Sequence, residues 1–229
     1  MDLKEIDLVD PQIHWYYQSK LRAVKKALRL WGHSFSRIVD VGAGSGFFGL
    51  EIIKDLKGVQ LICVDLNYPK DYVGDNGVIF QKSSDRCVAD VYLLIDVLEH
   101  VKDDVKLLNE YVEMAPKGSI FIQTVPAFEF LWSSHDDFLE HERRYNKKGL
   151  EIVNSLSGLE VLSSGYLFGT IFPLVFIARK LRSRSKNSSD MKPAPRVVNS
   201  ILKFVVSLEH KLPLNRFFGL SVMVISKKV

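Results

Sequence analysis

Short apolar runs rich in β-branched residues alternate with amphipathic segments along most of this chain. Apolar positions at helical spacing predict helices over 11–31, from 47 to about 54, around 105–112 and over 147–156. The runs between the helices predict buried strands at 38–41, 59–65, 78–80, 90–95, 120–125 and 159–163. Because strands and helices alternate, we expect a doubly wound, mostly parallel sheet.

The last third of the chain follows a different pattern. Residues 166–178 are almost continuously apolar, and 179–186 hold five basic residues in eight. Thirteen residues with an internal Pro173 cannot cross a hydrocarbon core of ~30 Å, which needs ~20 helical residues. An amphipathic helix is predicted over 197–212, and a last strand over 219–226. The fold class expected is therefore α/β, with seven strands, an N-terminal helix and a helical insertion before the last strand.

Composition narrows the class of protein further. Apolar residues make up 47% of the 229 residues and charged residues 25%, as in ordinary globular proteins. The net charge of +4 is mild and local, so we expect no nucleic-acid partner. The two cysteines, Cys63 and Cys87, lack metal-ligand spacing, which predicts neither a metal site nor a disulfide scaffold. With a polar N-terminus that lacks a secretory apolar segment, the chain is expected to be cytoplasmic.

A glycine-rich turn follows the first predicted strand. Gly42, Gly44 and Gly46 occupy alternate positions, and apolar residues at helical spacing begin at Phe47. A strand, a glycine turn and a helix together point backbone N–H groups at a ligand. Asp40, two residues before the turn, suits a ligand with a cationic group. Asp65 lies 23 residues after Gly42, where an acidic residue reaches the hydroxyls of a ribose.

This turn, the acidic residue at the end of the second strand and the phrase Asp-Val-Leu-Glu-His-Val at 96–101 resemble the class I S-adenosylmethionine-dependent methyltransferases. The resemblance implies S-adenosylmethionine as cofactor and S-adenosylhomocysteine as product. It also implies a single domain over 1–229, with a helical cap (1–35), a cofactor-binding core (36–165), an insertion (166–218) and a last strand (219–229). In this fold the last strand is expected to lie antiparallel beside the sixth strand. The cofactor contacts that it implies are Asp40, Gly42, Ala43, Gly44, Gly46, Asp65, Leu66, Ser84, Asp85, Asp96 and Val97.

Residues 126–146 form a long connection without periodicity, dense in aromatic, His and Arg residues, and such loops are usually functional. Its Leu-Trp-Ser-x-His-Asp and His-x-Arg-Arg-Tyr phrases resemble bacterial methyltransferases of cell-envelope glycan and lipid-linked pathways, and also ubiquinone-type O-methyltransferases. His135 and His141 are the candidate bases for an oxygen acceptor, whereas His100 is either catalytic or a helix cap. The candidate acceptor-binding residues are Trp132, Arg143, Arg144 and Tyr145.

The leading hypothesis is methylation, at oxygen, of a small or lipid-linked acceptor. The alternatives are a nicotinamide-dependent oxidoreductase, which the G-x-G-x-G spacing disfavours, and a non-catalytic module that binds a cofactor or a membrane. The apolar 166–178 segment beside the basic 179–186 run predicts peripheral contact with an anionic membrane, on its inner face. The other interpretation is that 166–178 packs as a cap over the acceptor pocket.

Overall fold

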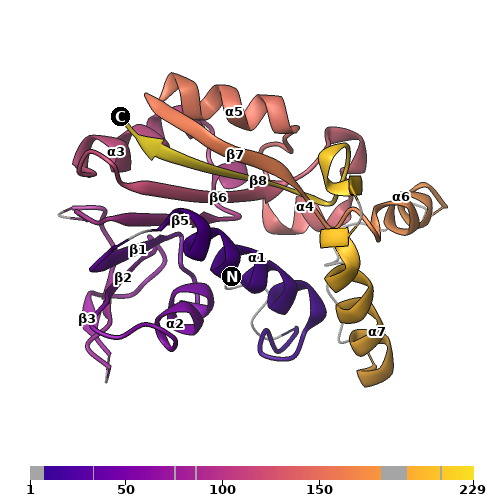
Figure 1. The fold of residues 1–229 in the computed structure, drawn as a ribbon, viewed down its shortest axis with the longest axis horizontal. Helices are drawn as coiled ribbons and strands as arrows, with labels where there is room; N and C mark the ends of the chain where they lie inside the picture. Colours follow the sequence, from indigo (N-terminus) through magenta and orange to yellow (C-terminus); the bar gives the residue numbers. More distant parts are fainter. Residues whose placement is uncertain (1–7, 33, 75, 86, 182–194, 212) are drawn as a thin grey trace.

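The structure is a computed structural model, and it describes residues 8–32, 34–74, 76–85, 87–181, 195–211 and 213–229. Within these residues eight strands form one sheet in the order β3-β4-β2-β1-β5-β6-β8-β7 (Figure 1). The doubly wound α/β fold predicted from the sequence is confirmed, with one strand more than expected.

The parallel part of the sheet positions the glycine turn. β1 (Arg37–Val41) lies between β2 (Gln60–Val64) and β5 (Val91–Ile95), and all three are parallel. β4 (Ile79–Gln81) continues the parallel sheet beyond β2, and β6 (Ile120–Pro126) continues it beyond β5. Strand order therefore reverses between β1 and β5. In such sheets a crevice opens at the carboxyl ends of the strands on either side of this reversal.

The far end of the sheet is antiparallel. β8 (Ser221–Lys228) lies between β6 and β7 (Leu159–Leu167) and pairs antiparallel with both. The pairing with β7, which is the sixth strand predicted, was expected, whereas the pairing with β6 was not. The additional strand, β3 (Tyr72–Val73), pairs antiparallel with β4 at the opposite edge. Both residues of β3 are exposed, so the strand has no buried apolar run by which the sequence could predict it. The Tyr72 ring stacks on the Phe80 ring of β4.

Helices cover both faces of the sheet, and successive residues of β1 show the two layers. Ile38 packs in a core with α1 (Trp15–Trp31) and α2 (Phe47–Ile53). Val39 and Val41 pack in a second core with α3 (Asp104–Met114) and α5 (Lys147–Leu156). Side chains of a strand alternate between faces, so one apolar strand contributes to both cores.

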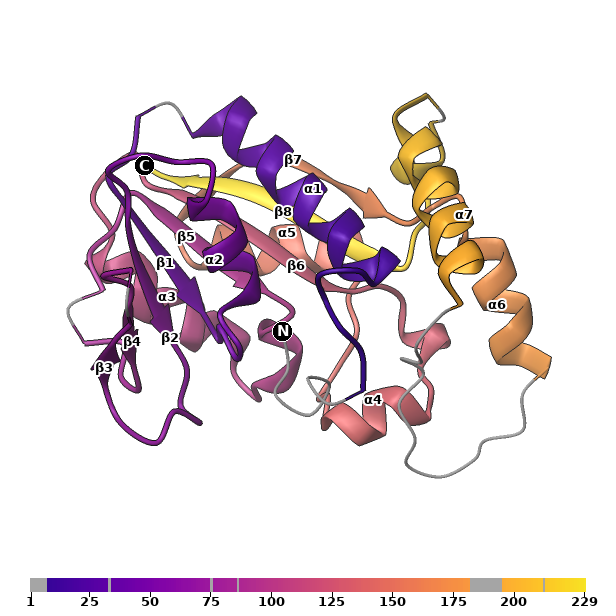
Figure 2. The same cartoon turned by 90° about the horizontal axis from the view of Figure 1, so that it is seen from below.

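The segments of the insertion before the last strand have bounds that differ from the predicted ones. Tyr166 and Leu167 belong to β7, because they continue its pairing with β8, and the helix α6 covers Phe172–Leu181. The next helix, α7, covers Arg196–Ser207 and is followed by 3₁₀ turns at Leu208–Lys211 and Pro213–Arg216. Both helices project beyond the end of the sheet (Figures 1 and 2). The part of the basic run after Leu181 lies outside the described residues.

The connection 126–146 is not the irregular loop that its lack of periodicity predicted. It contains a 3₁₀ turn at Glu129–Leu131 and the helix α4 (Ser134–Leu139). A capping box begins α4, in which the side chains of Ser133 and Asp136 each bind the other residue's backbone N–H. A helix of six residues is too short to show apolar periodicity, but the spacing Ser-x-x-Asp was a signal that could have located its start.

Candidate active site

A cavity of about 960 Å³ opens at the carboxyl ends of the central strands. It extends from the glycine turn after β1, past the end of β5, to α4 and α6. Aromatic residues of α1 (Trp15, Tyr16 and Tyr17) form another part of its wall. Small-molecule sites have volumes of roughly 300–1,000 Å³. This cavity therefore has room for a nucleoside-sized ligand and a second molecule beside it.

The glycine turn forms one end of the cavity. Gly42, Gly44 and Gly46 all have positive φ angles, between 54° and 73°, a region that residues with a side chain rarely adopt. A Cβ atom on Gly42 would lie 2.7 Å from Cγ2 of Val97, so the backbone here also leaves no space for a side chain. Glycine is therefore required at Gly42 both by conformation and by the close approach of the β5 end.

Asp65, directly after β2, holds this turn. Its Oδ2 accepts a hydrogen bond of 2.8 Å from the N–H of Gly44, and its Oδ1 accepts one of 2.9 Å from the N–H of Asn67. The Tyr68 hydroxyl donates to the Gly44 carbonyl oxygen at 2.8 Å. Asp65, Leu66 and Asn67 also line the cavity, so the acidic residue lies at the wall beside the turn.

Asp40 lies below the turn rather than in the cavity wall. It is buried, and its Oδ2 accepts a hydrogen bond of 3.0 Å from the N–H of Gly49, in the first turn of α2. Burial raises the pKa of Asp40 to about 6, the Gly49 hydrogen bond lowers it, and the nearby Asp65 carboxylate raises it further. In this structure Asp40 thus caps a helix.

The eleven predicted cofactor residues divide into two groups, according to whether they line the cavity. Those that line the cavity are Gly42, Gly44, Asp65, Leu66, Ser84, Asp96 and Val97. The residues outside the lining are Asp40, Ala43, Gly46 and Asp85. The structure therefore brings together residues from the ends of β1, β2 and β5 and from the segment after β4, as expected for one edge of a parallel sheet.

Asp96, at the end of β5, is held by a lysine from the N-terminal helix. Nζ of Lys20 forms an ion pair with Oδ2 of Asp96 and donates to the Tyr16 hydroxyl at 2.6 Å. The Thr124 hydroxyl donates to Oδ1 of Asp96 at 3.0 Å. Burial lowers the pKa of Lys20, but Asp96 and Tyr16 outweigh burial and raise the pKa above its usual value.

Lys20 is a basic residue of the amphipathic helix α1, and it is nevertheless buried. The Lys20 side chain is 0% exposed. It reaches Asp96, which itself has a left-handed φ of 56°, an uncommon conformation for a residue with a side chain. No sequence signal links two residues 76 positions apart, so this pair could be found only in the structure.

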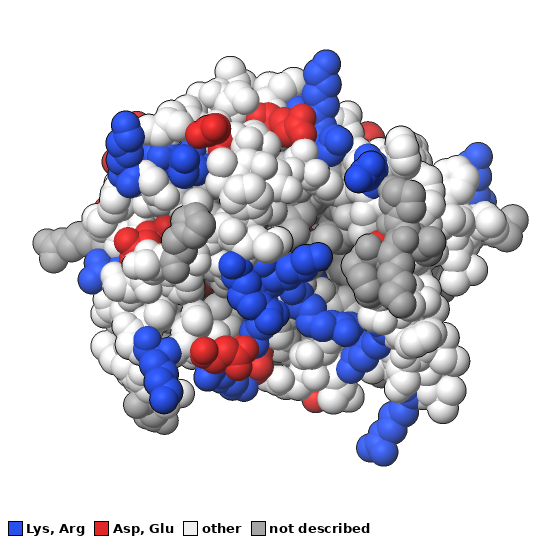
Figure 3. Space-filling model, viewed as in Figure 1, with Lys and Arg blue, Asp and Glu red and all other residues white. Residues whose placement is uncertain are grey.

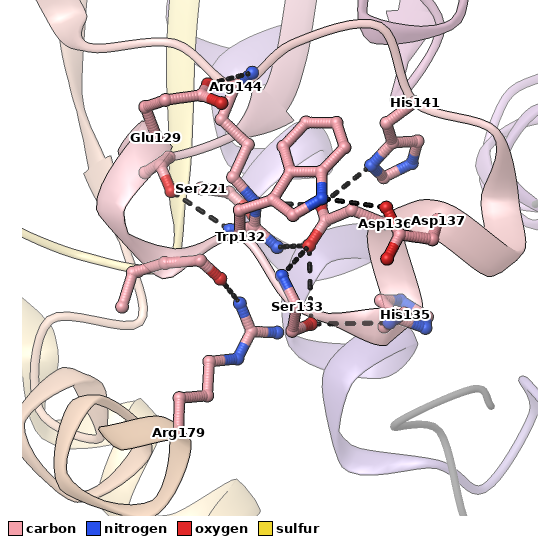
Figure 4. Close-up of polar contacts among 12 residues, drawn as sticks. Glu129, Trp132, Ser133, His135, Asp136, Asp137, His141, Arg144, Arg179 and Ser221 are labelled. Carbon is pink, nitrogen blue, oxygen red and sulfur yellow. Dashed lines mark hydrogen bonds and ion pairs between the residues drawn. The ribbon is translucent and has the colours of Figure 1, made fainter. Parts of the chain in front are cut away.

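At the other end of the cavity, Asp136 of α4 organises a polar cluster (Figure 4). Its two carboxylate oxygens accept hydrogen bonds from Nε and Nη2 of Arg144, at 2.7 and 2.9 Å. Nδ1 of His141 lies 2.9 Å from Oδ1 of Asp136, and the N–H of Ser133 donates to Oδ2 at 2.8 Å. Burial raises the pKa of Asp136, but the contacts with His141 and Arg144 hold it well below its usual range. Asp136 is therefore an anion inside the protein.

Both candidate bases, His135 and His141, line this end of the cavity together with Arg144. Arg179 of α6 also reaches it and donates to the Leu131 carbonyl oxygen (Figure 4). The contact between Asp136 and Nδ1 orients the His141 ring. When Nδ1 carries the proton, Nε2 of His141 has the free lone pair.

The remaining predicted acceptor-binding residues, Trp132, Arg143 and Tyr145, do not line the cavity. Nε1 of Trp132 donates to Asp137 at 2.9 Å. Arg143 donates to the carbonyl oxygens of Val101 and Lys102 and pairs with Asp104, and the Tyr145 hydroxyl donates to the same Asp104 at 2.7 Å. Within the His-x-Arg-Arg-Tyr phrase, Arg143 and Tyr145 thus fasten the connection 126–146 to the start of α3.

Two neighbouring residues after β5 complete the polar end of the cavity. Glu99 and His100 lie in a 3₁₀ turn at Leu98–His100, and both line the cavity. Glu99 is fully buried, and burial followed by the Asp96 carboxylate raises its pKa well above the usual value. The His100 and His141 rings are 4.7 Å apart between centroids, in an edge-to-face arrangement. Sequence reasoning singled out His100 but passed over Glu99.

Comparison of the structure with solved proteins places this arrangement of strands in one fold. A SAM-dependent methyltransferase from Archaeoglobus fulgidus aligns with a TM-score of 0.54 and 17% identity, over 93% of this chain and 99% of that one. Coclaurine N-methyltransferase bound to N-methylheliamine and SAH aligns with a TM-score of 0.54 and 14% identity, over 92% and 72% of the two chains. The [4+2]-cyclase SpnF aligns with a TM-score of 0.59 and 14% identity, over 96% and 84%.

The chain therefore has the fold of the class I S-adenosylmethionine-dependent methyltransferases. No protein-family model matches the sequence, and no curated protein matches it either. At identities this low the comparison defines the fold alone, and the cyclase among the similar structures shows that this fold supports other reactions. The reaction must be inferred from the residues of the site.

Proposed function

We propose that this protein is an S-adenosylmethionine-dependent methyltransferase that acts on an oxygen acceptor. The observation that carries the proposal is the continuous cavity from the Gly42–Gly46 turn and Asp65 to the Asp136–His141 pair. One end has the backbone and carboxylate that suit a nucleoside with a cationic amino acid. The other end has a histidine oriented by a buried carboxylate, which suits activation of a hydroxyl group.

The cofactor would be held by residues of the first end. Asp65 would bind the ribose hydroxyls, Leu66 and Ser84 would lie beside the base, and Gly42, Gly44 and Asp96 would lie along the methionine part. The cofactor supplies a methyl group on a sulfonium, so the chain itself needs only to orient and activate the acceptor. Orientation of two reactants in one cavity provides a large part of the acceleration.

His141 is the residue that we propose activates the acceptor. Asp136 fixes its ring, and Arg144 balances the charge of Asp136 within the protein. We expect His141→Ala to reduce methyl transfer by roughly 10²–10⁴-fold, the range for loss of a general base. His135→Ala is the matched comparison, because His135 of α4 lines the same end of the cavity. A larger loss at His135 would assign the role to that residue instead.

The cofactor assignment can be tested without knowing the acceptor. Calorimetric titration of the purified chain with S-adenosylhomocysteine, S-adenosylmethionine, NADH and NADPH separates the methyltransferase from the oxidoreductase. We expect the two adenosyl compounds to bind and the two nicotinamides not to bind. Methyl-transfer profiling on cell extract with labelled cofactor then separates an enzyme from a non-catalytic module, and chemical analysis of the product tests for an oxygen acceptor.

For the source of the acceptor, we propose a membrane surface. The described helices include none that is both long and apolar enough to cross a bilayer. However, α7 has no buried residue, and Phe204 on it is 64% exposed. Other large apolar side chains exposed on α6, on α7 and after them are Leu174, Ile177, Val197, Val198, Ile201 and Phe217.

The charged residues in the sequence of the 166–218 segment are mostly basic. Residues 166–218 contain ten Lys or Arg and two Asp or Glu. In Figure 3 the part of the surface over α6 and α7 is largely white, with Lys and Arg at its margin. Apolar side chains among basic ones fit a bilayer with anionic headgroups. Val175, Ala178 and Arg179 of α6 line the cavity, so an acceptor with a lipid tail would enter beside the membrane.

Co-sedimentation with vesicles tests the membrane proposal. We expect binding to vesicles of phosphatidylglycerol and phosphatidylcholine, weaker binding to phosphatidylcholine alone, and loss of binding as salt rises. The double variant Val198→Ser, Phe204→Ser should bind at least tenfold more weakly. The matched control is Ile152→Ser, which replaces an exposed apolar residue of α5. This variant should bind the vesicles as tightly as the wild type does. Equal sedimentation of wild type and double variant would reject the membrane surface and leave the cap interpretation.

A further inference from the structure

Glu99 is a buried carboxyl group whose two oxygens lack a hydrogen-bond partner among the described residues. Its side chain is fully buried, and neither Oε1 nor Oε2 forms a hydrogen bond with any other described residue. Such a group is costly to bury, because its hydrogen bonds to water are lost and nothing replaces them. Glu99 also lines the cavity. A cation bound in the cavity would remove this cost.

The two neighbouring carboxylates already have cations of their own. Asp96 pairs with Lys20, and Asp136 pairs with Arg144. Glu99 forms no ion pair within the described part of the chain, so it differs from both. The missing cation is therefore expected at Glu99 rather than elsewhere in the cluster.

Two imidazoles complete a set of donor atoms. Each of three residues offers one possible ligand atom, and the three atoms lie within 4.8 Å of one another. They are a carboxylate oxygen of Glu99 and a ring nitrogen each of His100 and His141. One carboxylate oxygen and two imidazole nitrogens are ligands of Zn²⁺ and related divalent transition metals at sites that keep a position open for a substrate. Behind His141, Asp136 contacts Nδ1 at 2.9 Å, which leaves Nε2 for the ion. A carboxylate behind a ligating histidine is the usual support of such a site.

We propose that Glu99, His100 and His141 bind one divalent transition-metal ion at the acceptor end of the cavity. The proposal revises the expectation of no metal, which rested on the spacing of the cysteines. It deepens the proposed function and rests on it for the role of the ion. At such a site the ion would bind the acceptor hydroxyl and lower its pKa, and the proton would pass to solvent water. His141 would then activate the acceptor as a ligand of the ion, and this role replaces the role of direct base given to it above.

Metal binding can be measured on the full chain without any acceptor or cofactor. After treatment with EDTA and its removal, the protein is titrated calorimetrically with ZnCl₂, MnCl₂ and MgCl₂. We expect one Zn²⁺ per chain, weaker Mn²⁺ and no measurable Mg²⁺, because two of three ligands are nitrogen. Titration with CoCl₂ should produce a visible absorption band that saturates at one ion per chain. The absence of a saturable site for any of these ions would overturn the proposal.

Matched variants locate the site. Glu99→Gln keeps the shape of the side chain and removes the charge, and should weaken Zn²⁺ binding at least tenfold, as should His141→Ala. Glu110→Gln alters a carboxylate that also lines the cavity, outside the cluster, and should leave binding unchanged. Circular dichroism confirms that each variant is folded. Equal Zn²⁺ affinity in Glu99→Gln and wild type would reject Glu99 as a ligand.

S-adenosylhomocysteine titrations of the same samples keep the two proposals apart. If the chain binds S-adenosylhomocysteine but no metal, the metal site is rejected and the methyltransferase proposal stands. If it binds metal but no adenosyl compound, the cofactor assignment fails while the metal site is retained.

Discussion

Lys20 of α1 and Asp96 at the end of β5 form an ion pair inside the protein, although they are 76 residues apart in the sequence. The pair fastens the N-terminal helix to the strand end at the centre of the cavity. Tyr16, one turn before Lys20, accepts a hydrogen bond from the same ammonium group and lines the cavity. The wall of the cavity therefore depends on this contact.

Replacement of Lys20 should destabilise the fold strongly. Lys20→Met keeps much of the side-chain volume but leaves the Asp96 carboxylate without its cation. We expect the free energy of unfolding to fall by about 2–4 kcal/mol, below the largest values for buried pairs because Asp96 is 29% exposed. Urea unfolding measures the change. Lys25→Met, which breaks the exposed pair with Asp55 on the same helix, should have little effect.

Addition of Asp96→Asn to Lys20→Met provides the check on this explanation. If the loss comes from an unpaired carboxylate, the double variant should regain part of the stability lost in the single variant. If both are equally unstable, packing of the lysine stem rather than charge explains the effect.

Substitution of Gly42 should also destabilise the protein, for two separable reasons. Gly42→Ala places a Cβ atom 2.7 Å from Cγ2 of Val97 and forces a residue with a side chain to a φ of 60°. The backbone part alone costs about 1–2 kcal/mol. The double variant Gly42→Ala, Val97→Ala relieves the contact but not the backbone strain, so thermal unfolding should show partial rescue. Full rescue would show that φ contributes nothing.

Stability should depend on pH through Asp40. Its pKa is about 6 in the folded protein, mainly because it is buried, and about 3.9 in an unfolded chain. Between these values the folded state keeps a proton that the unfolded state has lost. Stability therefore falls as the pH rises through this window, and the loss persists above pH 6.

Asp40→Asn removes this titration while its side-chain oxygen can still accept the Gly49 hydrogen bond. Relative to wild type, the variant should gain roughly 2–3 kcal/mol between pH 4 and pH 8. The groups near Asp40 are Asp65, Cys63 and Tyr68, and all three remain in the variant. Urea unfolding at the two pH values checks the gain. A difference of the same size at both would assign the pH dependence to other groups.

Asp136 and Asp137 are neighbours in α4, and they should respond differently to the same change. Asp136→Asn removes the charge that pairs with Arg144 and contacts His141, so we expect a loss of about 3–5 kcal/mol in stability. Asp137→Asn affects an exposed hydrogen bond from Trp132 and should change stability by less than about 0.5 kcal/mol. Similar losses in both would mean that the buried ion pair contributes no more to stability than the exposed hydrogen bond from Trp132 does.

The parts of the fold that the sequence predicted are those set by local patterns. The buried strands were visible because both faces of a parallel strand are covered, which leaves a continuous apolar run. The glycine turn was visible because three alternate glycines precede Phe47. The cofactor end of the cavity followed from these two patterns, since the carboxyl ends of parallel strands meet at one edge.

The parts that the sequence did not predict depend on contacts between distant residues. The burial of Lys20 depends on its ion pair with Asp96. Glu99 lacks a cation among the described residues because Lys20 pairs with Asp96 and Arg144 pairs with Asp136. The roles of Arg143 and Tyr145 depend on Asp104, some forty positions earlier. Residue type suggested that these two bind a ligand, but the three-dimensional partner decides what each one does.

The position of β8 in the sheet also affects how the protein can be made. Among the strands of the described residues, β7 has β8 as its only neighbour, and the ribosome must add the 53 residues from 168 to 220 before β8 begins. At roughly 5–20 residues per second this takes about 3–10 s. During that interval the nascent chain carries both β6 and β7 with an unpaired edge, which is a template for aggregation. Slow translation over 168–220 would prolong this exposure, so synonymous codon changes there should alter the yield of folded protein without altering its sequence.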